Sequence, residues 1–253
     1  MKPPRSAAIA RKRPFVFINM AMTADGKIAT SNRAVSSFGS KRDHDHLLEL
    51  RATADAVMAG ARTVDSNAVN LGPGPAKYRR LRTRRGLPPY NLRIILSRSG
   101  TIDPQADIFR HKFSPVIILT SRRAPESRLA ALRTVADEVK IFGDDAVDLA
   151  AALAWLREAH GVKRLACEGG AELNDGMLRA GLVDEVHVTV TPRVFGGRAA
   201  PTIADGQGAP GLDAATPLKL KSARRVGDEM FLVYAVKAPP ATDRRGTKRT
   251  RRS

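Results

Sequence analysis

The sequence predicts a single α/β domain with three layers, in which helices flank a mostly parallel sheet that ends in an antiparallel hairpin. Three observations support this fold class. Short apolar strands alternate with amphipathic helices along most of the 253 residues. Two of the strands run directly into glycine-containing turns, at Gly60 and at Gly169. The last two strands are joined by Gly227-Asp228, which is a hairpin signal.

The expected elements follow from hydrophobic periodicity and from turn residues. Strands buried on both faces are continuous apolar runs, whereas helices repeat apolar residues every three to four positions. In chain order, strands are expected at residues 14–20, 55–60, 92–96, 115–120, 138–142, 165–167, 184–191, 218–226 and 230–236. Helices are expected at residues 40–52, 126–136, 145–160 and from residue 171 to about residue 182.

The first expected strand and the first expected helix are each marked by residues close together in the chain. Residues 14–20 are apolar throughout, and Asp25-Gly26 marks a turn soon after them. Ser40 is the expected N-cap of a helix that runs to about Ala52, with Arg51 near its end. The buried side of that helix is expected to consist of Leu47, Leu48 and Leu50.

The second strand leads into a more irregular part of the chain. After residues 55–60, the turn Gly60–Val64 contains Thr63, whose hydroxyl can cap a helix or bind a phosphate. Residues 65–91 are expected to form a long polar loop, and loops of this length are often lids or binding loops. A group of basic residues lies in this loop: Lys77, Arg79, Arg80, Arg82, Arg84 and Arg85.

The second half of the chain contains the clearest helix, at residues 145–160, which is expected to end at Gly161. Residues 184–191 alternate like a half-exposed strand. The expected apolar face of the helix consists of Val147, Ala150, Ala151, Ala154, Trp155 and Leu156.

The segment Val162–Gly176 contains the strongest signal for a ligand-binding turn in the chain. Its short strand ends in Glu168-Gly169-Gly170 and enters a helix. Two glycines let the backbone approach a ligand closely and adopt positive φ, and the free N–H groups of a helix N-terminus attract anions. Glu168 stands at the carboxyl end of the strand, where open α/β sheets bind ligands. By itself, the segment also fits a tight strand-to-helix connection with a surface glutamate.

Two phosphate-friendly turns, at Gly60–Thr63 and Gly169–Ala171, and the polar pair Asp25 and Lys27 all follow strands. A parallel sheet brings such strand ends to one edge, so a nucleotide cofactor is the simplest interpretation. The sequence has no G-x-G-x-x-G, Walker A, C-x-x-C or H-E-x-x-H motif. His44 and His46 have no evident third ligand, and no metal site is expected.

Composition argues against a membrane-spanning protein and against a protein held together by internal disulfides. No apolar run is long enough to span a membrane, and the single Cys167 fits a reducing cytoplasm. The net charge is +18, and residues 1–13 and 237–253 together supply 11 of these charges. We expect these two stretches to be basic disordered tails around a domain at residues 14–236.

Several motifs occur in the order typical of one family. They are Asn19-x-x-x-Thr23-x-Asp25-Gly26-Lys27, Asp55–Gly60 with Thr63-Val64, Glu168-Gly169-Gly170-Ala171-x-Leu173-Asn174, Gly181–Glu185, Pro192-x-x-Phe195-Gly196-Gly197 and Ala200-Pro201-Thr202. Over residues 14–236 the chain resembles the riboflavin-biosynthesis pyrimidine reductases, a family with a dihydrofolate-reductase-like fold. No deaminase zinc motif precedes these blocks, so we expect a reductase alone.

The resemblance implies NADPH as cofactor, a ribosylamino-pyrimidine 5′-phosphate as substrate, reduction at C1′ of the opened ribose, and a homodimer. It implies catalytic roles for Lys27 and Glu168. The substrate-binding residues that it implies are Asp25, Ser36, Arg51, Leu71 and Glu168. The cofactor-binding residues that it implies are Ala21, Thr63, Asn67, Ser97, Gly169, Gly170, Ala171, Glu172 and Leu173.

The chain departs from the family after Thr63. The usual Ala-Asp-Asp-Pro turn is replaced by residues 65–73, Asn67 stands where an aspartate is expected, and the arginine for the substrate phosphate has no clear counterpart. One alternative is therefore a paralogue that reduces another pterin-like or pyrimidine-like substrate. Another is a nucleic-acid-binding protein that uses its basic residues, although an aromatic content of 5% provides no base-stacking platform.

Overall fold

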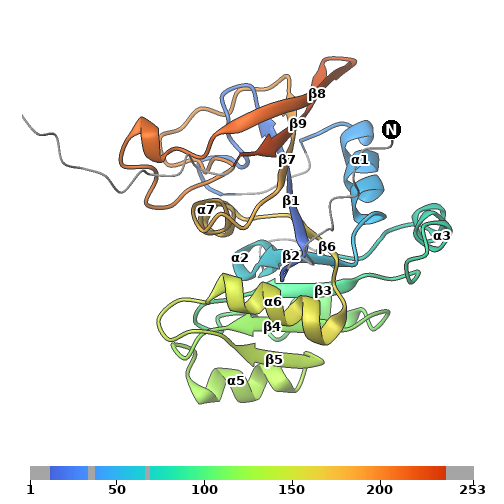
Figure 1. Ribbon diagram of the computed structural model, residues 1–253, viewed down its shortest axis with the longest axis vertical. Helices are drawn as coiled ribbons and strands as arrows, with labels where there is room; N and C mark the ends of the chain where they lie inside the picture. Colours follow the sequence, from blue (N-terminus) through green and yellow to red (C-terminus); the bar gives the residue numbers. More distant parts are fainter. Residues whose placement is uncertain (1–11, 34–37, 66–68, 238–253) are drawn as a thin grey trace, which may run out of the picture.

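The computed structural model describes residues 12–33, 38–65 and 69–237, and one sheet runs through them (Figure 1). Nine strands of this described part form the sheet, in the order β5-β4-β3-β2-β6-β1-β7-β9-β8. The strands are β1 (Phe15–Thr23), β2 (Ala56–Gly60), β3 (Leu92–Leu96), β4 (Val116–Thr120), β5 (Glu138–Ile141), β6 (Arg164–Cys167), β7 (Glu185–Thr191), β8 (Leu218–Val226) and β9 (Glu229–Val236). The helices are α1 (Lys41–Arg51), α2 (Ala61–Asp65), α3 (Ala76–Arg84), α4 (Asp107–Arg110), α5 (Glu126–Arg133), α6 (Leu149–His160), α7 (Ala171–Arg179) and the 3₁₀ turn η1 (Leu212–Ala214).

Strand direction divides the sheet into two parts. Neighbouring strands from β5 to β7 are parallel, whereas β9 pairs antiparallel with both β7 and β8. Parallel neighbours need crossover connections, and most of the helices lie in these connections. The expected α/β fold, with a mostly parallel sheet and a C-terminal hairpin, is confirmed.

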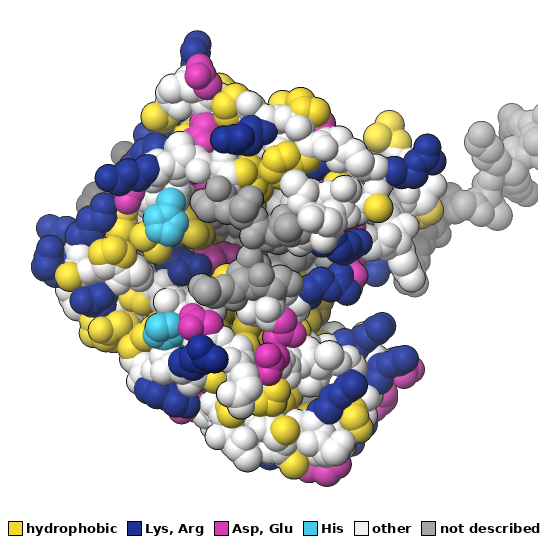
Figure 2. Space-filling view, turned by 180° about the vertical axis from the view of Figure 1, so that it is seen from behind, with side chains coloured by type: hydrophobic (Ala, Val, Ile, Leu, Met, Phe, Trp, Pro, Cys, Tyr) yellow, Lys and Arg dark blue, Asp and Glu magenta, His cyan; other side chains and the backbone are white. Residues whose placement is uncertain are grey.

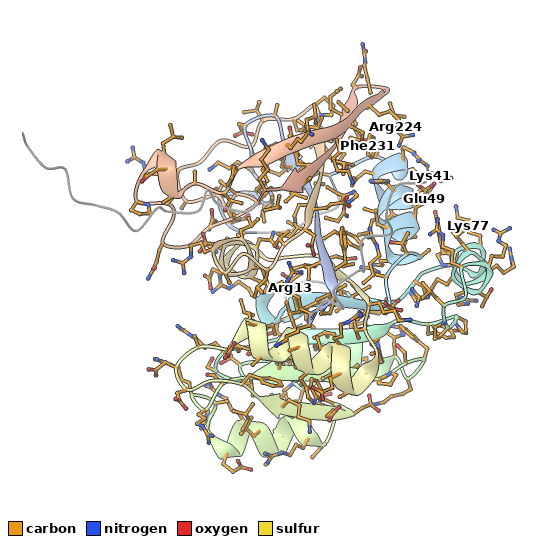
Figure 3. All side chains as sticks on the ribbon, viewed as in Figure 1. Arg13, Lys41, Glu49, Lys77, Arg224 and Phe231 are labelled. Carbon is orange, nitrogen blue, oxygen red and sulfur yellow. The ribbon has the colours of Figure 1, made fainter. Side chains whose placement is uncertain are left out.

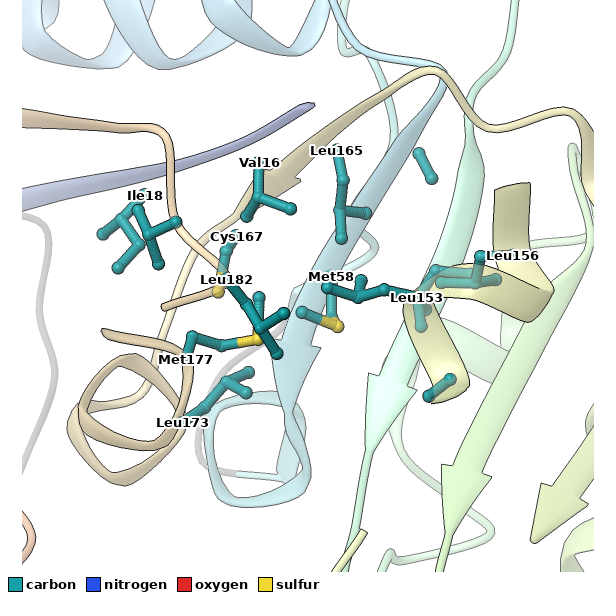
Figure 4. Packing of buried hydrophobic residues seen from close by; sticks show 14 of the residues in the cluster. Val16, Ile18, Met58, Leu153, Leu156, Leu165, Cys167, Leu173, Met177 and Leu182 are labelled. Carbon is teal, nitrogen blue, oxygen red and sulfur yellow. The ribbon is translucent and has the colours of Figure 1, made fainter. Parts of the chain in front are cut away.

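Apolar side chains from the sheet form a core on each of its faces. Along β1, Val16 and Ile18 belong to one core and Phe17 to the other, which explains why this strand is apolar at consecutive positions. The first core packs against α6 and α7 (Figure 4). The second packs against α1, α2, α4 and α5 through Leu50, Val64, Ile108 and Leu132. The result is the expected arrangement of three layers.

Helix ends follow the predicted capping residues. Ser40 accepts hydrogen bonds from the backbone nitrogens of Arg42 at 3.1 Å and Asp43 at 3.2 Å, so it caps α1 as expected. Leu48 and Leu50 are buried, whereas Leu47 is only half-buried. At the other end of the fold, Gly161 terminates α6 with a φ of +64°.

The start and the buried face of α6 differ from the expectation. The helix begins at Leu149 rather than at residue 145, because Asp148 caps it by accepting a hydrogen bond from Ala151 N at 3.0 Å. The buried residues are Ala152, Leu153 and Leu156, whereas Ala150 and Ala151 are exposed. The predicted apolar face was therefore wrong at Ala150 and Ala151 and right at Val147, Trp155 and Leu156, which belong to or pack against the first core, since alanines alone do not define which side of a helix meets the core.

The expected loop at residues 65–91 contains the helix α3, so this prediction was wrong. Tyr78 of α3 packs with Leu48 of α1 and with Ala52, the residue after that helix, and this tertiary contact stabilises a helix whose sequence is mostly basic. Arg82 of α3 is fully buried and donates hydrogen bonds to the carbonyl oxygens of Arg51, Ala54 and Pro88 at 2.8, 2.5 and 2.9 Å. Arg82 therefore ties α3 to the end of α1.

Strand β7 is buried on both faces and is not half-exposed, which corrects a second expectation. Val186 and Val188 face the first core. His187 and Thr189, on the opposite face, are also buried, because α1 packs there and places His46 6.4 Å from His187 between ring centroids. Polar residues at alternate positions of a strand therefore do not show that the face on which they lie is exposed to water.

The two predicted basic tails lie at the ends of the chain. Residues 1–11 and 238–253, which make up most of the two predicted tails, lie outside the described residues. Arg13 is described, and its guanidinium forms an ion pair with Asp184 at 2.7 Å next to the sheet (Figure 3). Within the described ranges, no helix is long and apolar enough to cross a membrane.

Candidate active site

The two glycine-containing turns lie side by side. They follow β2 and β6, which are parallel neighbours in the sheet. Gly60 N donates a hydrogen bond to Gly169 O at 2.7 Å, so the two turns are joined directly through their backbones. The expectation that both turns lie at one edge of the sheet is confirmed.

The two joined turns, Gly60–Thr63 and Gly169–Ala171, form a corner that is called the glycine corner below. Close contacts with other groups explain why this corner contains glycine. Gly169 has a φ of +83°, and a Cβ atom there would lie 3.0 Å from Met20 Sδ. A Cβ on Gly170 would lie 3.4 Å from Thr63 Oγ1. A side chain on Gly170 would therefore fill the space between the two turns, whereas one on Gly169 would press against β1. Gly170 is also the N-cap of α7 and makes no side-chain cap, which leaves the first N–H groups of that helix to other acceptors.

Arg51 and Glu168 form a bidentate ion pair next to the glycine corner, since Glu168 directly precedes Gly169. Arg51 Nε and Nη2 donate to the two carboxylate oxygens of Glu168 at 2.7 and 2.6 Å. Arg51 Nη1 also donates to Gly72 O at 2.6 Å. Both side chains are 10% exposed, so the carboxylate is held rigidly while part of it stays accessible.

Lys27 and Asp25 lie in the turn that follows β1. Lys27 Nζ donates to Ala200 O at 3.0 Å. The exposed Asp25 carboxylate accepts hydrogen bonds from Thr23 Oγ1, Gly196 N and Phe195 N, and these bonds hold its pKa below the ordinary value. Asp25 therefore ties the β1 turn to the segment around residue 195.

The remaining residues expected at the site are distributed over the corner and the core. Ala21 is half-buried on β1, Thr63 is half-buried in α2, and Ser97 is buried at the end of β3. Leu71 and Leu173 belong to the two cores, so only their backbones can approach a ligand. Ala171 opens α7, and the exposed Glu172 pairs with Arg62 at 3.3 Å. Ser36 and Asn67 lie outside the described residues.

Three polar residues beside the site were not selected from the sequence. Asn174 is fully buried and donates from Nδ2 to Ile203 O at 2.8 Å. Thr202 and Asp205 hydrogen-bond to each other next to the first turn of α7. Asn174 and Thr202 stand within the family motifs, which was the available signal, whereas nothing in the sequence marked Asp205. The described residues contain no group of three or more potential metal ligands.

Fold and site together define the class of protein. It is a doubly wound α/β protein with two joined glycine turns at the carboxyl edge of its sheet, where polar side chains also follow β1 and β6 and one ends α1. Residues 14–232 match the RibD C-terminal domain family. The chain therefore belongs to this family, which is the reductase family that the sequence motifs indicated.

Several relatives are similar over nearly their whole length. The 2,5-diamino-6-ribosylamino-4(3H)-pyrimidinone 5′-phosphate reductase of Methanothermobacter thermautotrophicus is 36% identical over 225 residues, which is 89% of this chain and 99% of the relative. A reductase of the same name from Aquifex aeolicus is 31% identical, covering 89% of this chain and 97% of that protein. The riboflavin biosynthesis protein RibD of Actinobacillus pleuropneumoniae is 29% identical, and the chain covers 59% of it.

Solved structures confirm the fold. A pyrimidine reductase-like protein from Corynebacterium diphtheriae superimposes with a TM-score of 0.75 at 23% sequence identity, and the match covers 89% of this chain and 92% of that structure. Similarity at this level of identity shows the shared architecture alone.

Proposed function

We propose that this chain is an NADPH-dependent reductase of riboflavin biosynthesis, and that it converts 2,5-diamino-6-ribosylamino-4(3H)-pyrimidinone 5′-phosphate to the ribitylamino product. The observation that carries the proposal is the joined pair of glycine turns beside Arg51, Glu168 and Lys27 in a member of this family. The choice of the diamino compound rests on relatives that bear its name and match the chain over almost their entire length.

The glycine corner fits a dinucleotide. A Cβ atom on Gly170 would occupy the space beside Thr63 and one on Gly169 would press against Met20, and the first N–H groups of α7 can donate to phosphate oxygens. In the proposal, Thr63 and the residues from Gly169 to Leu173 hold the phosphates, Ser97 lies toward the far end of the cofactor and Ala21 lies against the nicotinamide. When bound, NADPH supplies the hydride.

Glu168 is suited to recognise the pyrimidine. A carboxylate has about four acceptor positions, and Arg51 uses two of them, so Glu168 can still accept hydrogen bonds from amino groups of the substrate. Arg51 is turned toward Glu168 and Gly72 O. We therefore assign Arg51 mainly to holding Glu168 in place, with its remaining N–H groups available to the substrate.

Lys27 is suited to act at C1′. Its ammonium group has three N–H donors, one of which is directed to Ala200 O, so the others can polarise the imine that the opened ribose forms at C1′. As hydride adds to C1′, the electron pair of the C=N bond moves to nitrogen, which takes up a proton, and a cationic donor stabilises the charge that develops there. Most of the rate enhancement then comes from holding two bound molecules in the right orientation.

Because residues 65–73 differ from the usual family turn, the identity of the substrate is the part of the proposal that most needs an experiment. NADPH oxidation should be measured with the diamino ribosyl phosphate, with its deaminated analogue, with oxidised folate and without acceptor. We expect turnover with the diamino compound that exceeds the other three. Equal or faster turnover with folate would instead support the paralogue, and no turnover together with no NADPH binding would reject the reductase assignment.

The nucleic-acid alternative has one observation in its favour. Lys77, Arg80, Arg84 and Arg85 are exposed in and just after α3, and Figure 2 shows Lys and Arg side chains gathered on the side of the molecule where this helix lies. Replacing these four residues with Ala distinguishes a reductase from a nucleic-acid-binding protein. A reductase keeps its turnover, whereas an electrostatic binder loses affinity and salt dependence. The homodimer is also part of the proposal, and analytical ultracentrifugation tests it.

A further inference from the structure

We propose that Thr202 and Asp205 are positioning residues, and that segment 200–205 is a brace that holds Lys27 at a set position relative to the glycine corner. This inference rests on the proposed function, because Lys27 is assigned there to the substrate. It adds residues that contact neither substrate nor cofactor and act through the chain segment that they fold.

One side of the brace holds Lys27 through both its side chain and its backbone. Lys27 Nζ donates to Ala200 O at 3.0 Å. The next residue, Ile28, donates from its backbone nitrogen to Pro201 O at 2.9 Å, and Lys27 forms an antiparallel bridge with Thr202. Ala200 is buried, so the carbonyl that receives the ammonium lies in a packed segment.

The other side of the brace is attached to the start of α7. Asp205 N donates to Ala171 O at 3.2 Å, and Asn174 Nδ2 donates to Ile203 O at 2.8 Å. Ala171 directly follows Gly170 of the corner, and Asn174 N donates to Gly170 O at 3.0 Å. The segment that holds Lys27 is thus fastened to the helix start that is proposed to bind the cofactor.

The hydrogen bonds between Thr202 and Asp205 fold the segment between these two attachments. Thr202 Oγ1 donates to Asp205 Oδ1 at 2.6 Å, and Thr202 N lies 3.2 Å from both carboxylate oxygens. Hydrogen bonds to a charged acceptor are stronger than neutral ones, so this closed turn resists deformation. Displacing a reacting group by about 1 Å can slow an enzyme by about a hundredfold, so a rigid support between Lys27 and the cofactor corner matters for the rate.

A pair of matched substitutions tests the brace in the full chain. Thr202→Val preserves the shape and removes the hydroxyl, whereas Thr202→Ser retains the hydroxyl. We expect Thr202→Val to lower kcat by about tenfold with an NADPH Kd within about twofold of the wild type, and Thr202→Ser to restore most of kcat. Thr134→Val, which removes a hydroxyl from the exposed end of α5, should leave kcat unchanged.

Hydrogen exchange followed by mass spectrometry gives a readout without turnover. In Thr202→Val, amides of peptides that cover residues 24–30 and 200–206 should exchange faster than in the wild type, while peptides from β2 to β4 should not change. Unchanged exchange at residues 24–30, wild-type kcat in Thr202→Val, or equal losses of kcat and NADPH affinity would each overturn the inference. If the wild-type chain reduces none of the acceptors, the proposed function fails, and the exchange result alone decides whether the brace exists.

Discussion

Arg51 and Glu168 are 117 positions apart in the chain and meet in a two-pronged ion pair. One residue ends α1 and the other follows β6, so the pair links a helix to the strand that carries the glycine corner. Arg51 also reaches Gly72 O, in the segment where the chain departs from its family. The pair therefore connects three parts of the site.

Glu168→Ala should both destabilise the protein and slow it. Removing one member of a buried ion pair typically costs about 3–5 kcal/mol, and we expect about 2–3 kcal/mol here because both side chains are 10% exposed. We expect kcat/KM to fall by about a hundredfold, with NADPH affinity largely retained. Urea unfolding measures the first effect and steady-state kinetics the second.

The pairing itself is tested by a double-mutant cycle with Arg51→Met and Glu168→Leu. When both charges are removed, no unpaired charge remains, so the double variant should be at least about 1 kcal/mol more stable than the sum of the two single changes implies. Additive losses would show that the two side chains do not support each other in solution.

Lys27→Ala should lower kcat by about a hundredfold and leave NADPH binding intact, because the ammonium is assigned to charge that develops on the substrate. Stopped-flow turnover and fluorescence titration of NADPH give the two values. Lys112→Ala is the matched control, since Lys112 is exposed in the connection before β4. A parallel loss of turnover and NADPH affinity in Lys27→Ala would remove the assigned role.

Gly169→Val should abolish NADPH binding, whereas Gly181→Val should not. Both glycines have positive φ, at +83° and +64°, so both changes carry a strain of about 1–3 kcal/mol. Only Gly169 has close neighbours, with Met20 Sδ 3.0 Å from the position of a Cβ atom, whereas nothing lies within 4 Å of such an atom on Gly181. Thermal unfolding and NADPH titration of both variants separate strain from blocked binding. Normal NADPH affinity in Gly169→Val would show that the corner is not a phosphate site.

The stability of the protein should fall as the pH drops below about 6.5, the ordinary pKa of histidine. Burial lowers the pKa of His46 and of His187, and Glu49 and Glu185 oppose this shift, while Arg42, Arg164, Lys221 and Arg224 add to it. The unfolded chain then binds more protons than the folded one. Stability is therefore fully present above the unfolded pKa and is lost as the pH falls through the folded pKa values.

Each histidine can contribute a slope of up to about 1.4 kcal/mol per pH unit. Urea unfolding at pH values from 5 to 7.5 measures this slope. The double change His46→Gln and His187→Gln should flatten it, whereas His44→Gln, on the exposed side of α1, should leave it unchanged. An equally steep slope in the double variant would assign the pH dependence to other groups.

Cys167 should resist alkylation in the folded protein. It is fully buried, and burial raises the pKa of its thiol to about 12, so little thiolate forms near neutral pH. We expect iodoacetamide at pH 8 to label the urea-unfolded chain and not the native one, as measured by intact mass. Rapid labelling of the native protein would mean that β6 opens readily.

Local signals in the sequence determined the strands, several helix ends and the glycine turns of this protein. Continuous apolar runs located the strands, Ser40 and Gly161 marked helix ends, and the glycines of the β2 and β6 turns indicated the edge where the cofactor is proposed to bind, because each of these features depends on residues close together in the chain. Family motifs then indicated Lys27 and Glu168.

Only the tertiary structure decided which groups support these residues. The pairing of Arg51 with Glu168, the burial of Arg82 in a helix expected to be a loop, the burial of both faces of β7 and the attachment of residues 200–205 to Lys27 and to α7 all depend on segments far apart in sequence. Such contacts depend on how the elements pack, and the periodicity of one element carries no information about the surface that another element presents to it.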